Sequence, residues 1–442
     1  MAKQLHVVVV GAGLMGLCCA YFLRRGGALV TVVERHTGPG LGTSFANGAM
    51  LHGSLVQPWN APGVGMQLLR SIGQADAATV VRLRALPDLL GWGVDFLAAA
   101  TPERHLTATR ANLRLAQLTR QLMQQLRDEE GLQYGQRLSG ITVVFRDAEA
   151  LAVGMAKASS LQGLSGREND AKDTKHAWVH HRPLDVQQLV ALEPALAEVA
   201  ADLAGAIHYP EDEGGDAFAF CTELTQRCQR LGVVFRFGAP IQLRLTNGSA
   251  APVVLQGADP ISADAVVLAA GPQSEALARA LGLRLPIRPA KGYSLTCKVP
   301  PGVLAPQQPI VDHALHAAVV PVGKDRLRVV GTAEFAGHDL SLNPQRLDNL
   351  RRLLGRLYPR IDAALSADAL QPWAGLRPLS SDGVPLIGRS TVPGLWLCTG
   401  HGQLGWTLAA GSGHCLAAAL LGSTSAIDAA DYSPARFAKR MA

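Results

Sequence analysis

Near the N-terminus, three closely spaced glycines and a more distant acid have the spacing of a nucleotide-binding loop. Residues 11–16 read Gly-Ala-Gly-Leu-Met-Gly, and Glu34 follows about twenty residues later. In such a motif Gly11 allows a tight turn, Gly13 lets a pyrophosphate approach the backbone, and Gly16 lets the next helix pack closely on its strand. The carboxylate accepts hydrogen bonds from an adenosine ribose and would repel the 2′-phosphate of NADP. The spacing therefore predicts a dinucleotide site, and it leaves NAD and FAD as alternatives.

The elements needed to position these glycines surround them. Residues 6–10 are apolar and mostly β-branched, which is typical of a strand buried on both faces of a parallel sheet. Residues 17–25 predict a helix, and residues 29–33 predict a second strand that ends at Glu34. The N-terminus of such a helix offers free N–H groups and a positive dipole to a phosphate.

The same region also has the composition of a membrane segment. No charged residue lies between Gln4 and Leu23, and an apolar run of about twenty residues is a candidate transmembrane helix. The glycine spacing and a start that carries only Lys3 argue against an anchor or a signal peptide. We therefore expect no transmembrane helix here, with a membrane-anchored protein as the alternative from another functional class.

Composition excludes several other classes of protein. The 442 residues predict two or three domains, and the net charge of +6 comes from scattered Lys and Arg rather than from the basic runs of a nucleic-acid binder. The seven cysteines form no C-x-x-C pair, so we expect neither a disulfide framework nor a structural zinc site. His180 and His181 have no acidic or cysteine partner at ligand spacing, so we expect no metal site there.

Two further glycine-rich loops occur far from the first. Residues 37–48 carry small hydroxyl and amide side chains that can donate to a phosphate, although a surface loop is an equal alternative from this composition alone. Residues 263–271 predict a buried strand that ends at Gly271. Residues 400–407 follow a short strand at 396–399 and lead into a long Ala/Leu helix that ends at Leu421. A helix N-terminus there can point N–H groups at the flavin edge where negative charge develops on reduction, which favours FAD.

Several blocks together resemble the D-amino-acid oxidase superfamily of FAD-dependent oxidoreductases, and within it the small subunit of the bacterial D-amino-acid dehydrogenases. The resemblance covers nearly the whole chain, and its most specific blocks are residues 41–48, 58–64, 192–200, 291–296, 375–378 and 399–407. It implies an α/β, two-domain fold with a Rossmann-like FAD-binding domain and a mixed-sheet substrate domain. The FAD-binding domain would be discontinuous, with residues 1–85, 200–285 and 372–442, and the substrate domain would hold 86–199 and 286–371.

The resemblance and the glycine motifs also imply a set of binding residues. Arg377, in the sequence Gly-Leu-Arg-Pro, matches the arginine that binds the substrate carboxylate, for which a planar guanidinium gives bidentate geometry. No cysteine stands where covalently flavinylated relatives attach their cofactor, so we expect non-covalent FAD. The residues expected at FAD are Gly11, Gly13, Gly16, Glu34, Arg35, Thr43, Ser44, Asn47, Gly48, Gly271, Gly400, Gly402, Leu404, Gly405, Trp406 and Thr407.

The chain departs from the family pattern at two positions. Gln403 stands where some relatives have a second arginine, and Ala318 lies in a run of small residues where some have a tyrosine. We therefore expect Arg377 to act with fewer charged partners, with Tyr293, His316 and Gln403 as the candidates beside it. Packing of Tyr293 in the sheet is an equal alternative. His52 and His401 are ambiguous, and we favour a structural role for His52.

The resemblance implies hydride transfer from the substrate α-carbon to flavin N5, giving an imino acid that hydrolyses to a 2-oxo acid and ammonia. It further implies a quinone-type acceptor, and thus a cytoplasmic protein with peripheral contact to the inner face of the cell membrane. Residues 86–100 are apolar enough to face a membrane, although a buried helix is the favoured interpretation. The alternative enzyme is an oxidase that uses O2 on glycine, sarcosine, D-proline or D-hydroxyproline.

Overall fold

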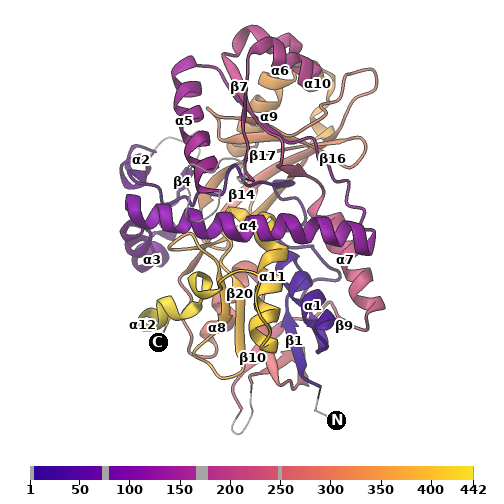
Figure 1. Ribbon diagram of the computed structural model, residues 1–442, viewed down its shortest axis with the longest axis vertical. Helices are drawn as coiled ribbons and strands as arrows, with labels where there is room; N and C mark the ends of the chain where they lie inside the picture. The colour runs from indigo at the N-terminus through magenta and orange to yellow at the C-terminus, as the bar shows by residue number, and fades with distance from the viewer. Residues whose placement is uncertain (1–3, 72–78, 166–177, 247–250, 442) are drawn as a thin grey trace.

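The computed structural model describes residues 4–71, 79–165, 178–246 and 251–441, and it consists of two halves, each built on a sheet (Figure 1). The lower half in the view contains a six-stranded sheet and the upper half a nine-stranded sheet. The long helix α4 (Pro102–Glu130) runs across the molecule between them. This architecture confirms the predicted α/β fold with two sheet-based domains.

The six-stranded sheet has the strand order β19-β20-β13-β1-β2-β9. Five of its strands are parallel, and β19 is antiparallel to β20. The valines of β1 are fully buried because helices or loops cover each face of the sheet, as the continuous apolar run predicts. The strands come from three distant parts of the chain: β1 (His6–Val10) and β2 (Leu29–Val33), β9 (Val234–Arg236) and β13 (Ala265–Leu268), and β19 (Leu386–Arg389) and β20 (Leu395–Thr399).

Two helices of this half begin next to the carboxyl ends of the parallel strands. They are α1 (Leu14–Arg25), which follows β1, and α11 (Gly405–Leu421), which follows β20. Glycines let α11 approach its neighbours closely, since a Cβ at Gly413 would lie 2.6 Å from the backbone of Cys18 and one at Gly411 2.8 Å from the Leu115 carbonyl oxygen. The helix N-termini are thereby held at one edge of the sheet.

The apolar segments that resemble membrane spans lie inside this half. Residues 4–23 form β1, a turn and α1 rather than one helix. Among the described residues one helical segment, 402–421, is long and apolar enough to cross a membrane, and 72% of its window is buried inside the protein. It packs against α1 and α4, so it serves as a core helix of this half.

The nine-stranded sheet has the order β18-β14-β17-β16-β15-β5-β7-β6, with β4 paired to β17. A long pair lies at one edge of this sheet: β14 runs antiparallel to β18 from Ile287–Ser380 to Thr296–Gln371. The two strands β4 and β7 belong to this sheet, although they fall inside the ranges 1–85 and 200–285 assigned above to the FAD-binding domain. The strands are β4 (Thr79–Val81), β5 (Ile141–Phe145), β6 (Arg182–Leu184), β7 (Gly205–Tyr209), β14 (Ile287–Lys298), β15 (Ile310–Asp312), β16 (Ala317–Val322), β17 (Arg326–Phe335) and β18 (Gln371–Ser380).

The remaining elements cover the sheets or connect them. Leucines of α9 and α6 pack with β14, β16 and β17 in one apolar cluster. These elements are α2 (Val64–Ser71), α3 (Leu86–Ala98), α5 (Ala148–Leu164), α6 (Val186–Leu192), α7 (Ala217–Arg230), α8 (Ser274–Arg279), α9 (Pro344–Leu357), α10 (Pro359–Ala364), α12 (Ala438–Met441), the pair β3 (Met50–Leu51) and β8 (Glu213–Gly214), and a small sheet of β10 (Ile241–Arg244), β11 (Val253–Gln256) and β12 (Asp259–Ile261).

Candidate active site

A large cavity lies where the two sheets meet, with a volume of about 1330 Å³. Its lining comes from the loops after β1, β2, β13 and β20 and from β14, β16, β17 and β18. This volume exceeds the ~300–1,000 Å³ of an ordinary small-molecule pocket. It therefore has room for a dinucleotide together with a small substrate.

The first glycine loop has the geometry that its spacing predicts. A Cβ at Gly11, where φ is +109°, would lie 2.6 Å from the Ala269 carbonyl oxygen, and one at Gly16 would lie 1.8 Å from the carbonyl oxygen of Gly11. Gly11 and Gly13 line the cavity, whereas Gly16 lies outside its lining and packs α1 against the turn. The N-cap residue of α1, Gly13, has no side chain to cap the helix, and of the first-turn N–H groups that of Leu14 is bound by Ser44. The other N–H groups of this turn are left as donors for a phosphate.

Glu34 and Arg35, the residues expected near the adenosine, both line the cavity. The Glu34 carboxylate also orders the glycine loop, because it accepts hydrogen bonds from the backbone N–H of Ala12 at 2.8 Å and of His36 at 2.9 Å. One oxygen thus holds the loop after β1 and the other holds the turn after β2. This second role is not visible in the spacing of the motif.

The loop at residues 37–48 brings four of its predicted residues to the cavity: Thr43, Ser44, Asn47 and Gly48. The Thr43 hydroxyl donates to the Leu376 carbonyl at 2.8 Å, and the Ser44 hydroxyl accepts from the Leu14 N–H at 3.3 Å. This loop therefore connects the α1 N-terminus to β18, the strand that carries Arg377. Gly271 also lines the cavity and has a φ of +54° at the turn after β13.

Only some residues of the loop 400–407 line the cavity. Gly402, Gln403, Gly405 and Trp406 line the cavity, whereas Gly400, Leu404 and Thr407 do not. Leu404 is buried in the apolar core, and a Cβ at Gly400 would lie 2.8 Å from the Leu386 side chain. The Thr407 hydroxyl accepts a hydrogen bond from the His52 N–H at 3.2 Å. The sequence pattern alone does not distinguish these two sets.

Several groups at this loop fit a flavin. The Trp406 indole Nε1 is buried and has no hydrogen-bond partner among the described residues, although a buried indole N–H normally has one. The α11 N-terminus also has no side-chain cap. Two helix N-termini whose N-cap residues give no side-chain bond, and one unsatisfied donor, therefore surround the same cavity. This arrangement suits the phosphates and the polar edge of FAD.

Arg377 on β18 is the most distinctive charged residue of the site. Its Nη1 donates to the Thr332 carbonyl at 3.0 Å, and its guanidinium carbon lies 5.5 Å from the centre of the Trp59 ring. Among the residues that the structure describes, no carboxylate lies within 4.0 Å of it. Burial lowers the pKa of Arg377 to about 10. A desolvated cation without an acidic partner, facing a cavity, is a receptor for an anionic ligand.

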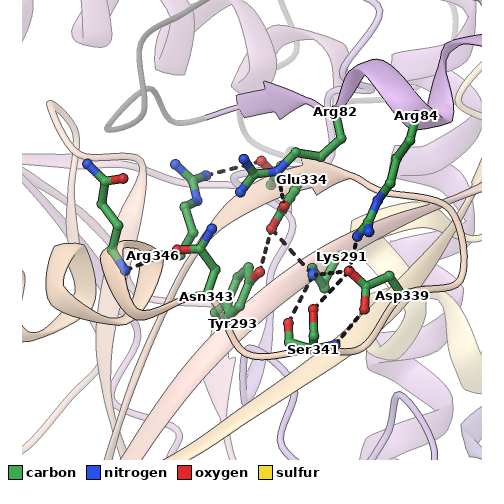
Figure 2. A network of polar contacts seen from close by, with 11 residues as sticks. Arg82, Arg84, Lys291, Tyr293, Glu334, Asp339, Ser341, Asn343 and Arg346 are labelled. Atoms are coloured by element: carbon green, nitrogen blue, oxygen red, sulfur yellow. Dashed lines mark hydrogen bonds and ion pairs between the residues drawn. The ribbon is translucent and has the colours of Figure 1, made fainter.

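Tyr293 lines the cavity, but its hydroxyl belongs to a polar network on the sheet (Figure 2). It donates to Glu334 Oε2, and the same carboxylate is bound by Arg82 and lies 3.5 Å from Lys291 Nζ. Burial raises the pKa of Tyr293, and the bond to Glu334 raises it further. Burial would also raise the pKa of Glu334, but Tyr293, Arg82 and Lys291 outweigh it and lower that pKa.

Lys291 connects this network to the segment 336–343, which follows β17. Its ammonium group is almost fully buried, donates to the Ser341 carbonyl at 3.0 Å and lies 3.6 Å from Asp339 (Figure 2). His338 and Leu340 of the same segment line the cavity. Lys291 therefore positions one wall of the site, a role that the sequence analysis missed although it named the block 291–296.

The other candidates reach the cavity without contacting Arg377 in any described hydrogen bond. His316 lines the cavity, and its backbone has a φ of +47°. Burial lowers the pKa of His316, and the nearby Lys157 charge lowers it further. Gln403 lines the cavity while donating to the Gln57 carbonyl at 3.2 Å. His52 and His401 line it too, and burial lowers the pKa of His52 to about 4.

Two aromatic residues of the site were missed. Trp59 lies against Arg377, and Trp373 lines the cavity and fills the space beside Gly375, where a Cβ would lie 2.0 Å from its ring. Trp59 lies in the block 58–64, one of the blocks that carry the family resemblance, and that block could have identified it as a site residue. In the described part of the chain, no group of three or more His, Cys, Asp or Glu could hold a metal ion, and no cysteine lines the cavity.

The chain matches a known family and close relatives over nearly its whole length. Residues 6–419 match the family described as FAD dependent oxidoreductase. The chain is 41% identical over 428 residues to a D-amino acid dehydrogenase of Paramagnetospirillum magneticum, with 96% of each chain covered. It is 37% identical to one of Methylobacterium nodulans, covering 98% of this chain and 100% of the relative.

Solved structures share the fold at low sequence identity. Glycine oxidase from Geobacillus kaustophilus superposes with a TM-score of 0.72 at 21% identity, covering 97% of this chain and 98% of that one. L-proline dehydrogenase from P. horikoshii superposes with a TM-score of 0.74 at 16% identity, covering 99% of each. By its sequence and its fold, the chain belongs to the family of FAD-dependent oxidoreductases.

Proposed function

We propose that this protein is an FAD-dependent D-amino acid dehydrogenase, which converts a D-amino acid into the 2-oxo acid and ammonia. The observation that carries the proposal is Arg377, a desolvated cation that faces the cavity without an acidic partner among the described residues. The full-length relatives at 34–41% identity are named D-amino acid dehydrogenases, which supports this substrate class.

The residues of the chain supply position rather than acid–base groups. FAD, when bound, accepts the electron pair that leaves the substrate α-carbon. Arg377 can hold the substrate carboxylate through two parallel N–H donors, which fixes the α-carbon relative to the cofactor. The Thr332 carbonyl and the Trp59 ring hold the guanidinium, so its orientation is set before a substrate binds.

The charge of the lining suits a neutral substrate amine. Among the described residues that line the cavity, Glu34 is the one acidic side chain, and it lies in the loop region expected to hold the adenosine. A substrate ammonium group near Arg377 would thus meet a like charge and no counter-charge. Since an amine must give up its proton before it can become an imine, this arrangement favours the reactive form.

We further propose that FAD is held non-covalently and that the electrons pass to a quinone-type acceptor, with the protein on the cytoplasmic face of the membrane. The absence of a cysteine from the described lining supports the first point. The alternative is an oxidase that passes the electrons to O2.

A substrate screen separates these possibilities. The purified holoenzyme is mixed with D- and L-amino acids, glycine, sarcosine and D-proline, with a dye acceptor under nitrogen and then with oxygen alone. The proposal expects dye reduction with D-amino acids, little peroxide in air, and a large loss of dye reduction in Arg377→Lys. Stoichiometric peroxide at an undiminished rate would favour the oxidase, and turnover of L enantiomers alone would contradict the proposal.

A further inference from the structure

Helix α3 exposes a row of apolar side chains beside its buried face, which is unusual for a helix at the surface. Its inner face packs into a cluster with the cavity residue Trp59 and contributes Trp92, Phe96 and Leu89. Its outer face carries four apolar residues at helical spacing whose side chains are exposed: Leu86 (43%), Leu90 (69%), Val94 (64%) and Leu97 (49%). An exposed apolar stripe of this kind is normally covered by protein or by lipid. Asp88 and Asp95 make the remaining side of the helix polar.

The exposed apolar surface extends beyond the helix. Leu83, in the turn before α3, is 79% exposed, and Met66 on α2 is 55% exposed. The two helices touch, since a Cβ at Gly65 would lie 3.2 Å from the Leu97 side chain. Helices α2 and α3 lie together at one edge of the molecule, on the left in Figure 1. We call the exposed side chains of Met66, Leu83, Leu86, Leu90, Val94 and Leu97 the α3 stripe.

The helix that carries the α3 stripe packs against residues of the active site. The Trp92 indole donates to the Leu379 carbonyl at 3.2 Å, and Leu379 lies two residues after Arg377 on β18. Trp59, which contacts the Arg377 guanidinium, packs in the same apolar cluster as Trp92 and Leu379. One layer of side chains therefore separates the wall of the cavity from the helix that carries the stripe.

A cationic pocket adjoins the first turn of α3. Its volume is about 350 Å³, and its lining contains Arg279, Arg284 and Arg288 with Glu275 and Leu285. Arg288 Nε donates to the Asp88 carbonyl at 2.7 Å, which places the pocket beside the helix. Glu275 pairs with Arg279, but Arg284 and Arg288 have no carboxylate within 4.0 Å among the described residues.

We propose that the α3 stripe and this arginine pocket form one docking surface for an anionic lipid bilayer. The apolar side chains would enter the boundary between the lipid headgroups and the acyl chains, while Arg284 and Arg288 bind lipid phosphates. Interfacial helices bind membranes through the same two kinds of contact. A second copy of the chain fits less well, because an isologous contact would bring the arginine pockets of both copies into one interface. The inference rests on the proposed function, since a membrane-dissolved acceptor needs the site near the bilayer.

Vesicle flotation of the purified holoenzyme tests this surface. Vesicles of phosphatidylcholine with phosphatidylglycerol are compared with phosphatidylcholine alone, for the wild type, for Leu90→Glu with Val94→Glu, and for Arg284→Gln with Arg288→Gln. Leu138→Glu is the control, because Leu138 is 59% exposed and follows Arg137, which pairs with Gly214 and Gly323 rather than with α3. Dye-linked activity is measured for every variant.

The wild type and the control should float with the anionic vesicles, and each double variant should lose at least about tenfold of that binding. Dye-linked activity should stay unchanged, because none of these residues lines the cavity. Equal flotation of the α3 variant, or no flotation of the wild type, would overturn the surface. A dimer that Leu90→Glu with Val94→Glu dissociates, without vesicle binding, would assign the stripe to a second copy. Absence of dye-linked activity in the wild type would instead refute the proposed function and leave the flotation result standing.

Discussion

A Cβ atom at Gly292 would lie 2.3 Å from Arg377 Nη2, so the guanidinium occupies the space that any side chain on this residue would fill. Gly292 lies in β14 beside β18, at the point where the β14–β17 register shifts between Lys291 and Tyr293. The position of the Arg377 guanidinium therefore depends on the absence of a side chain at Gly292.

Replacing either member of this pair should weaken substrate binding. Arg377→Ala removes two charge-assisted hydrogen bonds to the substrate carboxylate, worth together about 3–4 kcal/mol, so kcat/KM should fall by a factor of order 10²–10³. Gly292→Ala keeps the charge but displaces the guanidinium, and KM should rise by about tenfold or more. Gly91→Ala is the matched control, because a Cβ there meets nothing within 4 Å. Unchanged KM in both variants would refute the carboxylate role.

The first glycine loop should control FAD content. Gly16→Ala would place a methyl group 1.8 Å from the Gly11 carbonyl oxygen, which forces the loop and the α1 N-terminus apart. We expect this variant to purify with less than about a tenth of the wild-type flavin absorbance, because the pyrophosphate loses its backbone donors. Gly93→Ala, where a Cβ again meets nothing within 4 Å, should retain its flavin. Full flavin content in Gly16→Ala would contradict this placement of the cofactor.

The network around Glu334 should stabilise the fold and the cavity wall. Glu334→Gln leaves the buried Lys291 ammonium with a weaker partner, and breaking a buried ion pair costs about 3–5 kcal/mol. Tyr293→Phe removes one hydrogen bond into the same carboxylate and should cost only about 1–2 kcal/mol. Urea denaturation of the two holoenzymes measures both values. An equal, small loss in each variant would show that Lys291 is held by Asp339 and Ser341 instead.

Acid should destabilise the protein through a histidine outside the cavity. Burial lowers the pKa of His208 to about 4, whereas an unfolded histidine titrates near 6.5. Between these two pH values the unfolded chain binds a proton that the folded chain does not, so the free energy of unfolding decreases as pH falls from about 6.5 to about 4.

A variant can isolate this contribution. His208→Gln should flatten the pH dependence of the free energy of unfolding by up to about 1.4 kcal/mol per pH unit in this window. Measurements at pH 8 provide the reference, because the histidine is neutral there in both states. Parallel curves for the variant and the wild type between pH 6.5 and 4 would show that His208 does not carry the effect.

The sequence predicted the parts of the fold that follow from local patterning. The valine run of β1, the glycine spacing at residues 11–16 and the apolar strand at 265–269 each specify an element without help from the rest of the chain. The α3 helix was only half predicted. Its inner face is buried as favoured, but Leu90 and Val94 are exposed. Periodicity cannot tell how much of a broad apolar face a neighbour covers.

The polar contacts of the site could not be predicted from local sequence patterns. The bond from Thr43 to Leu376 joins residues 333 positions apart, and the contact between Trp59 and Arg377 depends equally on tertiary structure. Lys291 reads in the sequence as an ordinary strand residue, since its burial follows from Asp339, Ser341 and Glu334, which meet it only in the fold. Arg377, which the resemblance named, lines the cavity, whereas Leu404 and Thr407 of the loop 400–407 do not. Leu404 is buried in the apolar core, and the Thr407 hydroxyl binds the His52 N–H.

Anaerobic mixing of the holoenzyme with single enantiomers tests the central claim most directly. The loss of oxidised flavin absorbance is followed as a D-amino acid or its L enantiomer is added without any electron acceptor. The account predicts that the D enantiomer bleaches the flavin with a saturable rate, and that Arg377→Ala needs a concentration of order 10²-fold higher. Flavin that no D-amino acid bleaches, or that bleaches with the same concentration dependence in Arg377→Ala, would contradict it.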